Sequence, residues 1–309
     1  VLGWKGPNGT RLVLLDEVHT YSGVHGAQVA LTLRRWFNAN TRPHQNQPVF
    51  VGLSATLRDA GDFFATLTGL DRAKVEVISP LKSDLRPTSR EYGVVLRGDP
   101  LSGAALLSTS IQTLMLLGRV LDNQPSMFGS VGFAFTDDLD VINRLYDNLR
   151  DAEGLDPRGM ARGEVLADLR SPAGPHASAR YPDGQSWDLP DKLGRMGRSL
   201  RIARTSSQDA GVDSSADLIV ATASLEVGFN DPRVGAVIQH KAPRDMASFL
   251  QRRGRAGRYL AMRPITAVVL SDYGRDRIAY QSYEQLLEPE IGARSLPVAN
   301  RFVVKIQAT

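Results

Sequence analysis

Short apolar runs recur in the first part of the chain, and each is followed by a stretch of helical periodicity. The runs cover residues 11–15 and 49–53, and both end in acidic or small polar residues. Runs this short cannot make stable helices and are typical of buried strands in parallel sheets. The apolar spacing after each run predicts helices over residues 26–38 and 59–68.

The same alternation returns in the second half of the chain. Apolar runs there predict strands, and longer periodic stretches predict helices. The predicted strands cover 131–135, 218–221, 234–238 and 265–270, and the predicted helices cover 101–123 and 137–151. Because strands that alternate with helices form parallel sheets, we predict an α/β fold with two doubly wound domains.

Changes in composition mark the domain boundaries. We predict a first domain over residues 1–83, a linker rich in Pro, Gly and charge over 84–99, and a second domain over 100–275. A polar insertion at 153–213 interrupts the second domain, and residues 276–309 begin a C-terminal extension. The length and composition of the insertion favour a mobile segment.

Three single features refine this division. Trp187, inside the insertion, could stack on a base or anchor the insertion to its domain, and anchoring is the favoured role. The chain opens on Val1 rather than Met, and residues 302–307 alternate like a strand still in progress. From these two features we infer that the chain is a fragment of a longer protein and lacks that protein's N-terminal part.

Composition narrows the classes of function. The 309 residues include no cysteine, which excludes disulfides, thiol nucleophiles and Cys-ligated zinc. No apolar run approaches the roughly 20 residues of a membrane-spanning helix, so we expect a soluble, cytoplasmic protein without a membrane partner. The formal charge of +4 suits a polyanionic partner without requiring one.

Two carboxylates stand at the end of the first predicted strand. Open α/β sheets bind ligands at the carboxyl ends of their strands, where Asp16 and Glu17 lie. In a phosphate-cleaving site one carboxylate holds Mg²⁺ through water, and another orients and deprotonates the attacking water. Asp16 fits the first role and Glu17 the second. An acidic turn after a strand explains the pair equally well.

A cluster of arginines occupies residues 251–258, Gln-Arg-Arg-Gly-Arg-Ala-Gly-Arg. On a helix, Arg255 and Arg258 would be three positions apart and could point at one target. A phosphate is a suitable target, because arginines can stabilise the charge of a phosphoryl-transfer transition state. A basic surface patch that meets nucleic acid or solvent is the alternative interpretation of the cluster.

Taken together, these segments resemble the motifs of the superfamily 2 helicases. Asp-Glu-Val-His at 16–19 resembles motif II, and Ser-Ala-Thr at 54–56 resembles motif III. Residues 132–136, 220–228 and 251–258 resemble motifs IV, V and VI, in the family's order. The resemblance implies two RecA-like parallel-sheet domains, the first incomplete at its N-terminus. It also implies an ATP-dependent nucleic-acid helicase or translocase that uses ATP and Mg²⁺.

A further pattern is similar to one branch of this superfamily, the bacterial DNA helicases related to the mitomycin-repair helicase and the Lhr-type helicases. The pattern consists of residues 16–21, Gly23, Gly26, Val29, Arg34 and Arg35. Residues 288–300 also resemble the segment after the second core domain in that branch. The branch implies DNA, single-stranded or tailed, as the partner, and DNA repair or phage defence as the setting.

The resemblance assigns the catalytic roles to four residues. Asp16 would coordinate Mg²⁺ through water, Glu17 would be the general base, and Arg255 and Arg258 would be arginine fingers. The resemblance assigns nucleotide binding, nucleic-acid binding and coupling to other residues. His19 and Gln251 would bridge the two domains near the γ-phosphate, Ser54 and Thr56 would couple hydrolysis to domain movement, and Thr222 would contact the nucleic-acid backbone.

Motif V departs from the family pattern at one position. Gly228 would contact the nucleotide, and the family usually has Asp two residues later. Asn230 stands there in this chain, and Asp231 comes next. The resemblance therefore leaves the contact to the ribose open between Asn230 and Asp231.

The phosphate-binding Walker A loop has no counterpart in this sequence. That loop needs a Gly-Lys-Ser or Gly-Lys-Thr, and no Gly-Lys pair occurs in the 309 residues. We expect the rest of the same polypeptide or a separate chain to supply it, and we predict that residues 1–309 alone do not hydrolyse ATP.

Two alternative functions share the predicted sheets. The first is a helicase-like module that binds nucleic acid or a partner without hydrolysis, which the missing loop and Asn230 would suit. The second is a dinucleotide-binding oxidoreductase, but that class needs a Gly-x-Gly-x-x-Gly after its first strand, which this sequence lacks.

Overall fold

The computed structural model describes residues 10–40, 47–54, 57–86, 89–98, 105–121, 127–137, 139–156, 158–161, 165–166, 171, 186–188, 192, 199–205, 213–222, 231–288, 290–292 and 295–308. The chain divides into two compact units, Val1–Arg86 with Glu288–Thr309, and Pro87–Leu287. Each unit carries parallel strands and helices, which confirms the predicted α/β class. None of the described helices is both long and apolar enough to cross a membrane.

The first unit is built around a pair of parallel strands. Its elements are β1 (Leu12–Leu15), the 3-10 helix η1 (Val18–Thr20), α1 (Gly23–Asn40), β2 (Val49–Gly52), α2 (Ala60–Thr68), η2 (Arg72–Lys74), η3 (Lys82–Asp84) and α10 (Arg301–Ala308). Strands β1 and β2 pair in register, with Leu12 opposite Val49 and Leu15 opposite Gly52. Helix α2 ends at Thr68, as predicted, and Gly69 after it takes a left-handed conformation and donates its N–H to the oxygen of Ala65.

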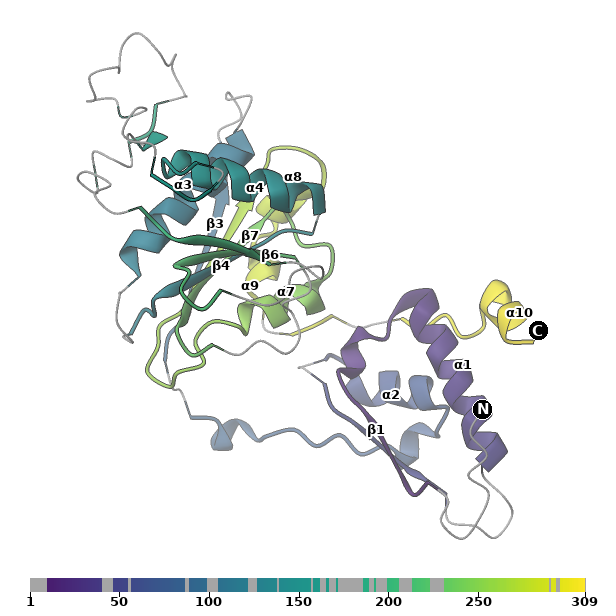
Figure 1. Ribbon diagram of the computed structural model, residues 1–309. Coiled ribbons are helices and arrows are strands. Elements are labelled where there is room, and N and C mark those ends of the chain that lie inside the picture. The colour runs from purple at the N-terminus through teal and green to yellow at the C-terminus, as the bar shows by residue number, and fades with distance from the viewer. Residues whose placement is uncertain are drawn as a thin grey trace. The chain divides into compact units, whose positions relative to one another are not determined.

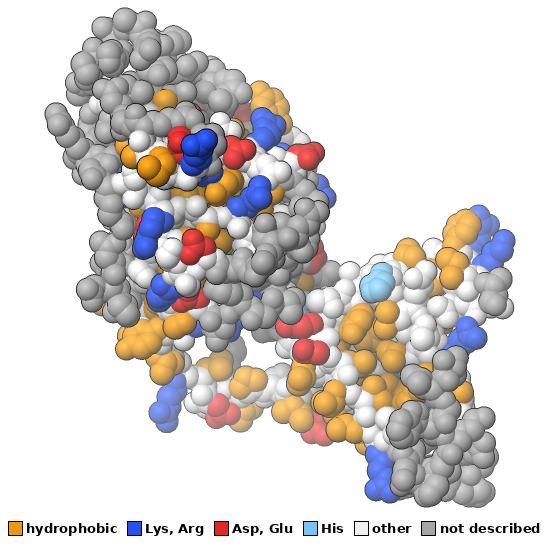
Figure 2. Space-filling view, viewed as in Figure 1, with side chains coloured by type: hydrophobic (Ala, Val, Ile, Leu, Met, Phe, Trp, Pro, Cys, Tyr) orange, Lys and Arg blue, Asp and Glu red, His pale blue; other side chains and the backbone are white. Residues whose placement is uncertain are grey.

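The two faces of the β1–β2 pair differ. On one face Phe50 is buried and packs against the rings of Trp36 and Phe37 from α1. On the other face Leu14 is 64% exposed, and its neighbours along the face are exposed as well: Leu12, Val49 and Val51. Hydrophobic side chains also gather on the visible surface of the unit that carries α1 (Figure 2). Full burial of these strands, as predicted, is wrong for the described residues, because helices cover only one face.

The last residues form a helix rather than the predicted strand. Asn300 caps α10, its side-chain oxygen accepting the backbone N–H of Phe302 at 3.0 Å. The buried side chain of Val303 lies on this helix, which packs against α1, and Arg35 donates to the backbone oxygen of Gln307 at 2.5 Å. The alternating apolar residues misled the strand prediction, because the cap and the contact with α1 favour a helix.

The second unit is a six-stranded sheet with helices on both faces. Its elements are β3 (Tyr92–Arg97), α3 (Ala105–Val120), β4 (Val131–Phe135), α4 (Leu139–Ala152), β5 (Ile202–Thr205), β6 (Leu218–Ala221), β7 (Val234–His240), α7 (Met246–Arg253), β8 (Ile265–Leu270), α8 (Gly274–Gln281) and α9 (Glu284–Leu287). The strand order is β3-β8-β7-β4-β6-β5, and every pair is parallel. Figure 1 shows α3 and α4 on one side of this sheet and α7 and α9 on the other.

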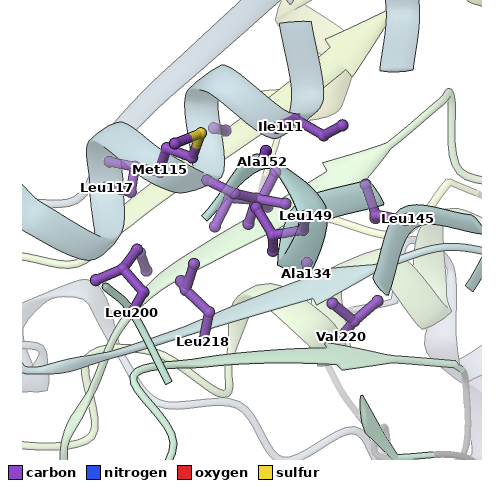
Figure 3. Packing of buried hydrophobic residues seen from close by; sticks show 14 of the residues in the cluster. Ile111, Met115, Leu117, Ala134, Leu145, Leu149, Ala152, Leu200, Leu218 and Val220 are labelled. Atoms are coloured by element: carbon purple, nitrogen blue, oxygen red, sulfur yellow. The ribbon is translucent and has the colours of Figure 1, made fainter. Parts of the chain in front are cut away.

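The core of the second unit follows the alternation of the central strands. Side chains of α3 and α4 pack onto Ala134, Leu218 and Val220, as Figure 3 shows. Phe133 and Phe135 of β4 point to the opposite face and belong to a separate buried cluster. All five residues of β4 are buried, so the sheet is covered on both faces at its centre, as parallel sheets require.

Both edge strands of this sheet lie where the sequence predicted irregular structure. Strand β3 falls in the segment predicted as a linker, and β5 falls in the predicted insertion 153–213. Edge strands are paired on one side only, so they can be short and polar, and their periodicity is correspondingly weak. The structure also divides the predicted extension 276–309, because α8 and α9 belong to the second unit and Glu288–Thr309 to the first. The short helix predicted near 161–170 falls largely outside the described residues.

Two buried contacts fasten the insertion to its domain. Trp187 is buried in the main core cluster, and its Nε1 donates to Ser108 Oγ on α3 at 3.1 Å, which confirms its anchoring role. The carboxylate of Glu153, at the start of the insertion, accepts from Arg119 at 2.7 and 2.8 Å and from the N–H of Leu200 at 3.1 Å. Residues near the beginning of the insertion and in its later part are therefore both held at α3.

Candidate functional site

Asp16 and Glu17 follow β1 at its carboxyl end. The backbone there is tied to the neighbouring strand, because Leu53 donates its N–H to Leu15 at 2.8 Å and Val18 donates to Leu53 at 2.9 Å. Glu17 takes a left-handed conformation with φ of 49°, a backbone state that few residues other than glycine adopt and that recurs at functional sites. This turn sends the chain directly from β1 into η1.

The two carboxylates have different surroundings. Asp16 is exposed, and its Oδ1 accepts the backbone N–H of Glu17 at 2.9 Å. Glu17 is partly buried, and its Oε2 lies 3.4 Å from Nδ1 of His19. Carboxylate oxygens are the ligands that Mg²⁺ prefers, and one exposed carboxylate with water suits an ion that keeps most of its hydration shell. The donor chemistry at Asp16 therefore fits Mg²⁺ held through water.

His19 connects the end of β1 to the end of β2. Its side chain is fully buried, and Nδ1 lies 3.3 Å from Ser54 Oγ. The same ring nitrogen makes both contacts, so in one tautomer Nδ1–H can donate to the carboxylate or to the hydroxyl, and in the other Nδ1 can accept from the hydroxyl. The structure thus brings together three residues that the sequence singled out, Glu17, His19 and Ser54. Thr56 lies outside the described residues.

The arginine cluster of the second unit begins on α7. Asp245 caps this helix by accepting the N–H of Ser248 at 3.1 Å, and the helix ends at Arg253. The chain then turns, with the N–H of Arg255 bonded to the oxygen of Arg252 at 3.0 Å. The prediction that Arg255 and Arg258 share a helical face is wrong, because both residues come after the end of α7.

The loop 254–258, which we call the arginine loop, is fixed at Gly257. This residue has φ of 76°, and its N–H donates to the oxygen of Val234 at 3.1 Å. A Cβ at this position would come within 2.7 Å of the Pro264 ring. Both the conformation and the close approach require glycine, so the arginine loop has a defined course at the start of β7.

The four arginines fall into two pairs. Arg252 and Arg253 are bound by carboxylates: Arg252 donates to Asp137 at 2.6 Å, and Arg253 donates to Glu91 at 3.1 and 3.0 Å. Arg255 is partly buried in the arginine loop, and Arg258 is exposed, with its Nε donating to the oxygen of Gly254 at 3.1 Å. The interpretation of the whole cluster as a surface patch is therefore wrong for the first pair, which is structural.

Asp137 and Gln239 are the residues of this site that the sequence did not reveal. Asp137 was expected only as the first residue of the helix predicted over 137–151, and Gln239 lies at the end of a strand among apolar residues. Both bind Arg252, Gln239 through its side-chain oxygen at 2.8 Å. The one signal available in the sequence was the position of Asp137, just after the carboxyl end of β4.

The remaining predicted residues occupy separate positions of the second unit. Gln251 is partly buried in the last turn of α7, and Thr222 is buried just after the carboxyl end of β6. The Asp231 carboxylate accepts from the Arg233 guanidinium at 2.6 to 3.2 Å, and this hydrogen bonding lowers the pKa of Asp231 below its ordinary value. Gly228 and Asn230 lie outside the described residues. The Asp231 side chain is thus engaged within its own turn.

Comparisons with known protein sequences agree with these motifs. The family described as helicase conserved C-terminal domain matches residues 192–260. The Lhr helicase/uracil glycosylase of Escherichia coli (strain K12) is 31% identical over 264 residues, which are 81% of this chain and 16% of that protein. The Lhr helicase/probable uracil glycosylase of Mycolicibacterium smegmatis is 28% identical over 257 residues, 80% of this chain and 15% of that protein. The chain spans about one sixth of the length of these relatives.

Two solved structures resemble almost the whole chain. Helicase Lhr of Mycobacterium smegmatis, bound to ssDNA and AMP-PNP, matches with a TM-score of 0.59 and 18% identity over 96% of this chain and 33% of that chain. The DUF1998 helicase MrfA, bound to DNA and AMPPNP, matches with a TM-score of 0.55 and 17% identity over 95% of this chain and 35% of that chain. At these identities the likeness is one of fold, that of RecA-like helicase domains.

Proposed function

Because the chain is related to the superfamily 2 helicases of the Lhr and mitomycin-repair type, we propose that it works as the coupling part of an ATP-dependent helicase or translocase. The observation that carries the proposal is the contact of buried His19 with both Glu17 and Ser54. It joins a candidate base for hydrolysis to Ser54, just after the neighbouring strand β2. Coupling of hydrolysis to movement needs such a connection, because a change at the base has to reach other parts of the protein.

The carboxylates would carry the hydrolytic step. Asp16 would hold Mg²⁺ through water, and the bound ion would neutralise charge on the phosphates of ATP. Glu17 would orient the attacking water and accept its proton, and the neighbouring His19 would keep the carboxylate in place. The left-handed backbone of Glu17 supports this role, because strained conformations of this kind recur at functional sites.

The second unit would supply charge stabilisation. We propose finger roles for Arg255 and Arg258, because the resemblance to motif VI assigns this role to these two positions of residues 251–258. Their guanidinium groups would act on the γ-phosphate when charge develops in the transition state. Gln251 and Gly228 would contact the nucleotide as well. Since Asp231 is held by Arg233, we propose Asn230 rather than Asp231 for the ribose contact.

DNA, single-stranded or tailed, is the partner we propose, with Thr222 contacting its backbone. A structural neighbour of this fold was solved with ssDNA, which supports this choice. Backbone contacts are sequence-independent and weaken with salt, because binding releases counterions from the phosphates. We place this activity in the cytoplasm and in DNA repair or phage defence, in keeping with the branch to which the chain is related.

We propose that the Walker A loop comes from the rest of the same polypeptide or from a separate chain. Two observations support this. No Gly-Lys pair occurs in the 309 residues, and one face of the β1–β2 pair exposes four apolar side chains, Leu12, Leu14, Val49 and Val51. Further strands or helices packed on that face would bury them, and a phosphate-binding loop carried there would lie near the carboxyl end of β1.

The test is ATP turnover by the intact protein with and without single-stranded DNA. We expect DNA-stimulated hydrolysis that falls by at least about 100-fold in Glu17→Gln, with the affinity for DNA retained. A matched control is Glu76→Gln, which removes an exposed carboxylate of the same unit and should leave turnover unchanged. Equal turnover of Glu17→Gln and the wild type would refute the role of Glu17. No hydrolysis by the wild type would favour a non-catalytic binding module.

A further inference from the structure

One buried guanidinium connects three elements of the second unit. Arg252 lies in the last turn of α7 and is 2% exposed. Its two terminal nitrogens donate to Asp137 at 2.6 Å and to Gln239 at 2.8 Å, and its guanidinium carbon lies 5.5 Å from the centre of the Phe135 ring. The contacts therefore come from the end of β4, the end of β7 and the segment between β4 and α4.

The partners of Arg252 are themselves held in place. Gln239 is fully buried, and its side-chain nitrogen donates to the oxygen of His240 at 3.3 Å. His240 in turn lies 2.7 Å from the hydroxyl of Ser110 on α3, through Nδ1. A charge buried this deeply is tolerated only with paired charge and satisfied hydrogen bonds, and a satisfied network favours one geometry over its alternatives. The network thus fixes Arg252 against the centre of the sheet.

Asp137 contacts both ends of α7 with one carboxylate. Its Oδ2 accepts the backbone N–H of Arg244, just before the helix, at 3.0 Å. Its Oδ1 accepts from Arg252 in the last helical turn, at 2.6 Å. Because both contacts go to the same side chain, α7 can neither rotate nor slide along the sheet without breaking one of them.

The position of α7 sets the course of the arginine loop. The backbone oxygen of Arg252 accepts the N–H of Arg255 at 3.0 Å, so Arg255 is bonded directly to the arginine that Asp137 holds. The loop is fixed at its other end by Gly257, which donates to Val234. A shift of Arg252 would therefore move Arg255 directly and would strain the segment that leads to Arg258.

We infer that Asp137 and Gln239 are positioning residues for catalysis: by holding Arg252 they set where Arg255 and Arg258 stand at the nucleotide. This inference rests on the proposed function. The two residues touch no substrate and act through the arginine loop. Misplaced finger arginines lose their effect on the transition state while ATP binding, which uses other groups, is retained. Weakening the contacts of Arg252 with Asp137 and Gln239 should therefore lower kcat and leave KM for ATP nearly unchanged.

The test compares three variants of the intact protein. Asp137→Asn keeps one acceptor oxygen and loses the other together with the charge, and we expect kcat to fall by about tenfold with KM changed by less than about twofold. Gln239→Met removes the acceptor for Arg252 and the weaker donor to the His240 oxygen but leaves Asp137 in place, and we expect a fall in kcat of about threefold. Glu153→Gln is the matched control, since it neutralises another buried carboxylate paired with an arginine in the same unit. It should lower stability and leave kcat unchanged.

A second background separates positioning from general destabilisation. In Arg255→Ala one of the side chains that Asp137 positions through Arg252 is already missing. Adding Asp137→Asn should therefore lower kcat by much less than tenfold, about threefold or less. The inference would be overturned if Asp137→Asn lowered kcat equally in both backgrounds, or if it raised only KM. If Asp137→Asn does not fold, a wild-type kcat in Gln239→Met would overturn it. If the wild type has no DNA-stimulated turnover, it is the proposed function that fails.

Discussion

His19 Nδ1 lies 3.3 Å from Ser54 Oγ, and the two residues come just after the paired strands β1 and β2. The parallel register accounts for this proximity, because Leu15 pairs with Gly52 and the two chains leave the sheet side by side. The same imidazole lies 3.4 Å from Glu17. A change at Glu17 during hydrolysis would therefore reach the end of β2 through one side chain.

Loss of the Ser54 hydroxyl should uncouple hydrolysis from movement. In Ser54→Ala the buried His19 keeps its contact with Glu17 and loses its contact with the segment that follows β2. We expect DNA-stimulated ATP turnover within about threefold of wild type and strand displacement per ATP reduced by at least about tenfold. Both quantities are measured on a tailed duplex. Thr32→Ala, which removes a hydroxyl from the exposed surface of α1, is the control and should change neither. A parallel loss of both activities would argue against coupling.

Replacing Arg258 by lysine should abolish most turnover although the charge is kept. Lysine cannot reproduce the planar fork with which a guanidinium meets phosphate oxygens. We expect kcat to fall by about 100-fold or more in Arg258→Lys, with ATP affinity largely retained. Steady-state hydrolysis at saturating DNA measures the loss. Arg277→Lys is the matched substitution at an exposed arginine of α8, and it should behave as wild type. Equal activity of the two variants would remove Arg258 from the proposed site.

Sequence periodicity predicts the central strands well and the edge strands poorly. Strands β4, β6 and β8 have the predicted bounds, because continuous apolar runs result from burial on both faces. Strand β3 lies in the segment predicted as a linker, and β5 lies in the predicted insertion. Each edge strand is paired on one side only, and β3 is largely exposed. Its short apolar run was missed because Pro, Gly and charged residues surround it in the segment predicted as a linker.

The division of labour within the arginine cluster could not be predicted either. Four arginines in eight residues are equivalent in sequence, and they differ only in their tertiary partners far along the chain. Asp137 precedes Arg252 by 115 positions, and Glu91 precedes Arg253 by 162. The placement of His19 beside Ser54, in contrast, results from two neighbouring parallel strands. The pattern of neighbouring strands therefore accounts for the proximity of His19 and Ser54, whereas local pattern carries no information on the distant partners of the arginines.

The buried pair of Arg119 and Glu153 should stabilise the second unit. Removing one partner of a buried ion pair leaves an uncompensated charge, so Glu153→Gln should lower the free energy of unfolding by about 3 kcal/mol. The loss should be visible locally as faster hydrogen exchange of the Leu200 N–H, which donates to the Glu153 carboxylate. Arg58→Gln breaks the pair with Glu290, in which both side chains are exposed, and should cost less than about 1 kcal/mol. Comparable losses in the two variants would contradict the structural role of Glu153.

The pair of Asp231 and Arg233 should make stability depend on pH in the acidic range. Hydrogen bonding from Arg233 lowers the pKa of Asp231 in the folded protein, while the unfolded chain keeps the ordinary value. The stability that the pair contributes is therefore fully present above that ordinary value and is lost as pH falls through the lowered one.

Urea unfolding of the intact protein, followed from neutral pH to about pH 3, measures this contribution. We expect wild type to be more stable than Asp231→Asn at neutral pH, with the difference shrinking as the carboxyl is protonated. Arg233→Gln keeps the carboxyl and removes its donor, so it should show the same shrinking difference from wild type. If the difference between wild type and either variant stays constant over this range, the Asp231 carboxylate does not stabilise the turn before β7. Asp231 would then be as suitable for the ribose contact as Asn230.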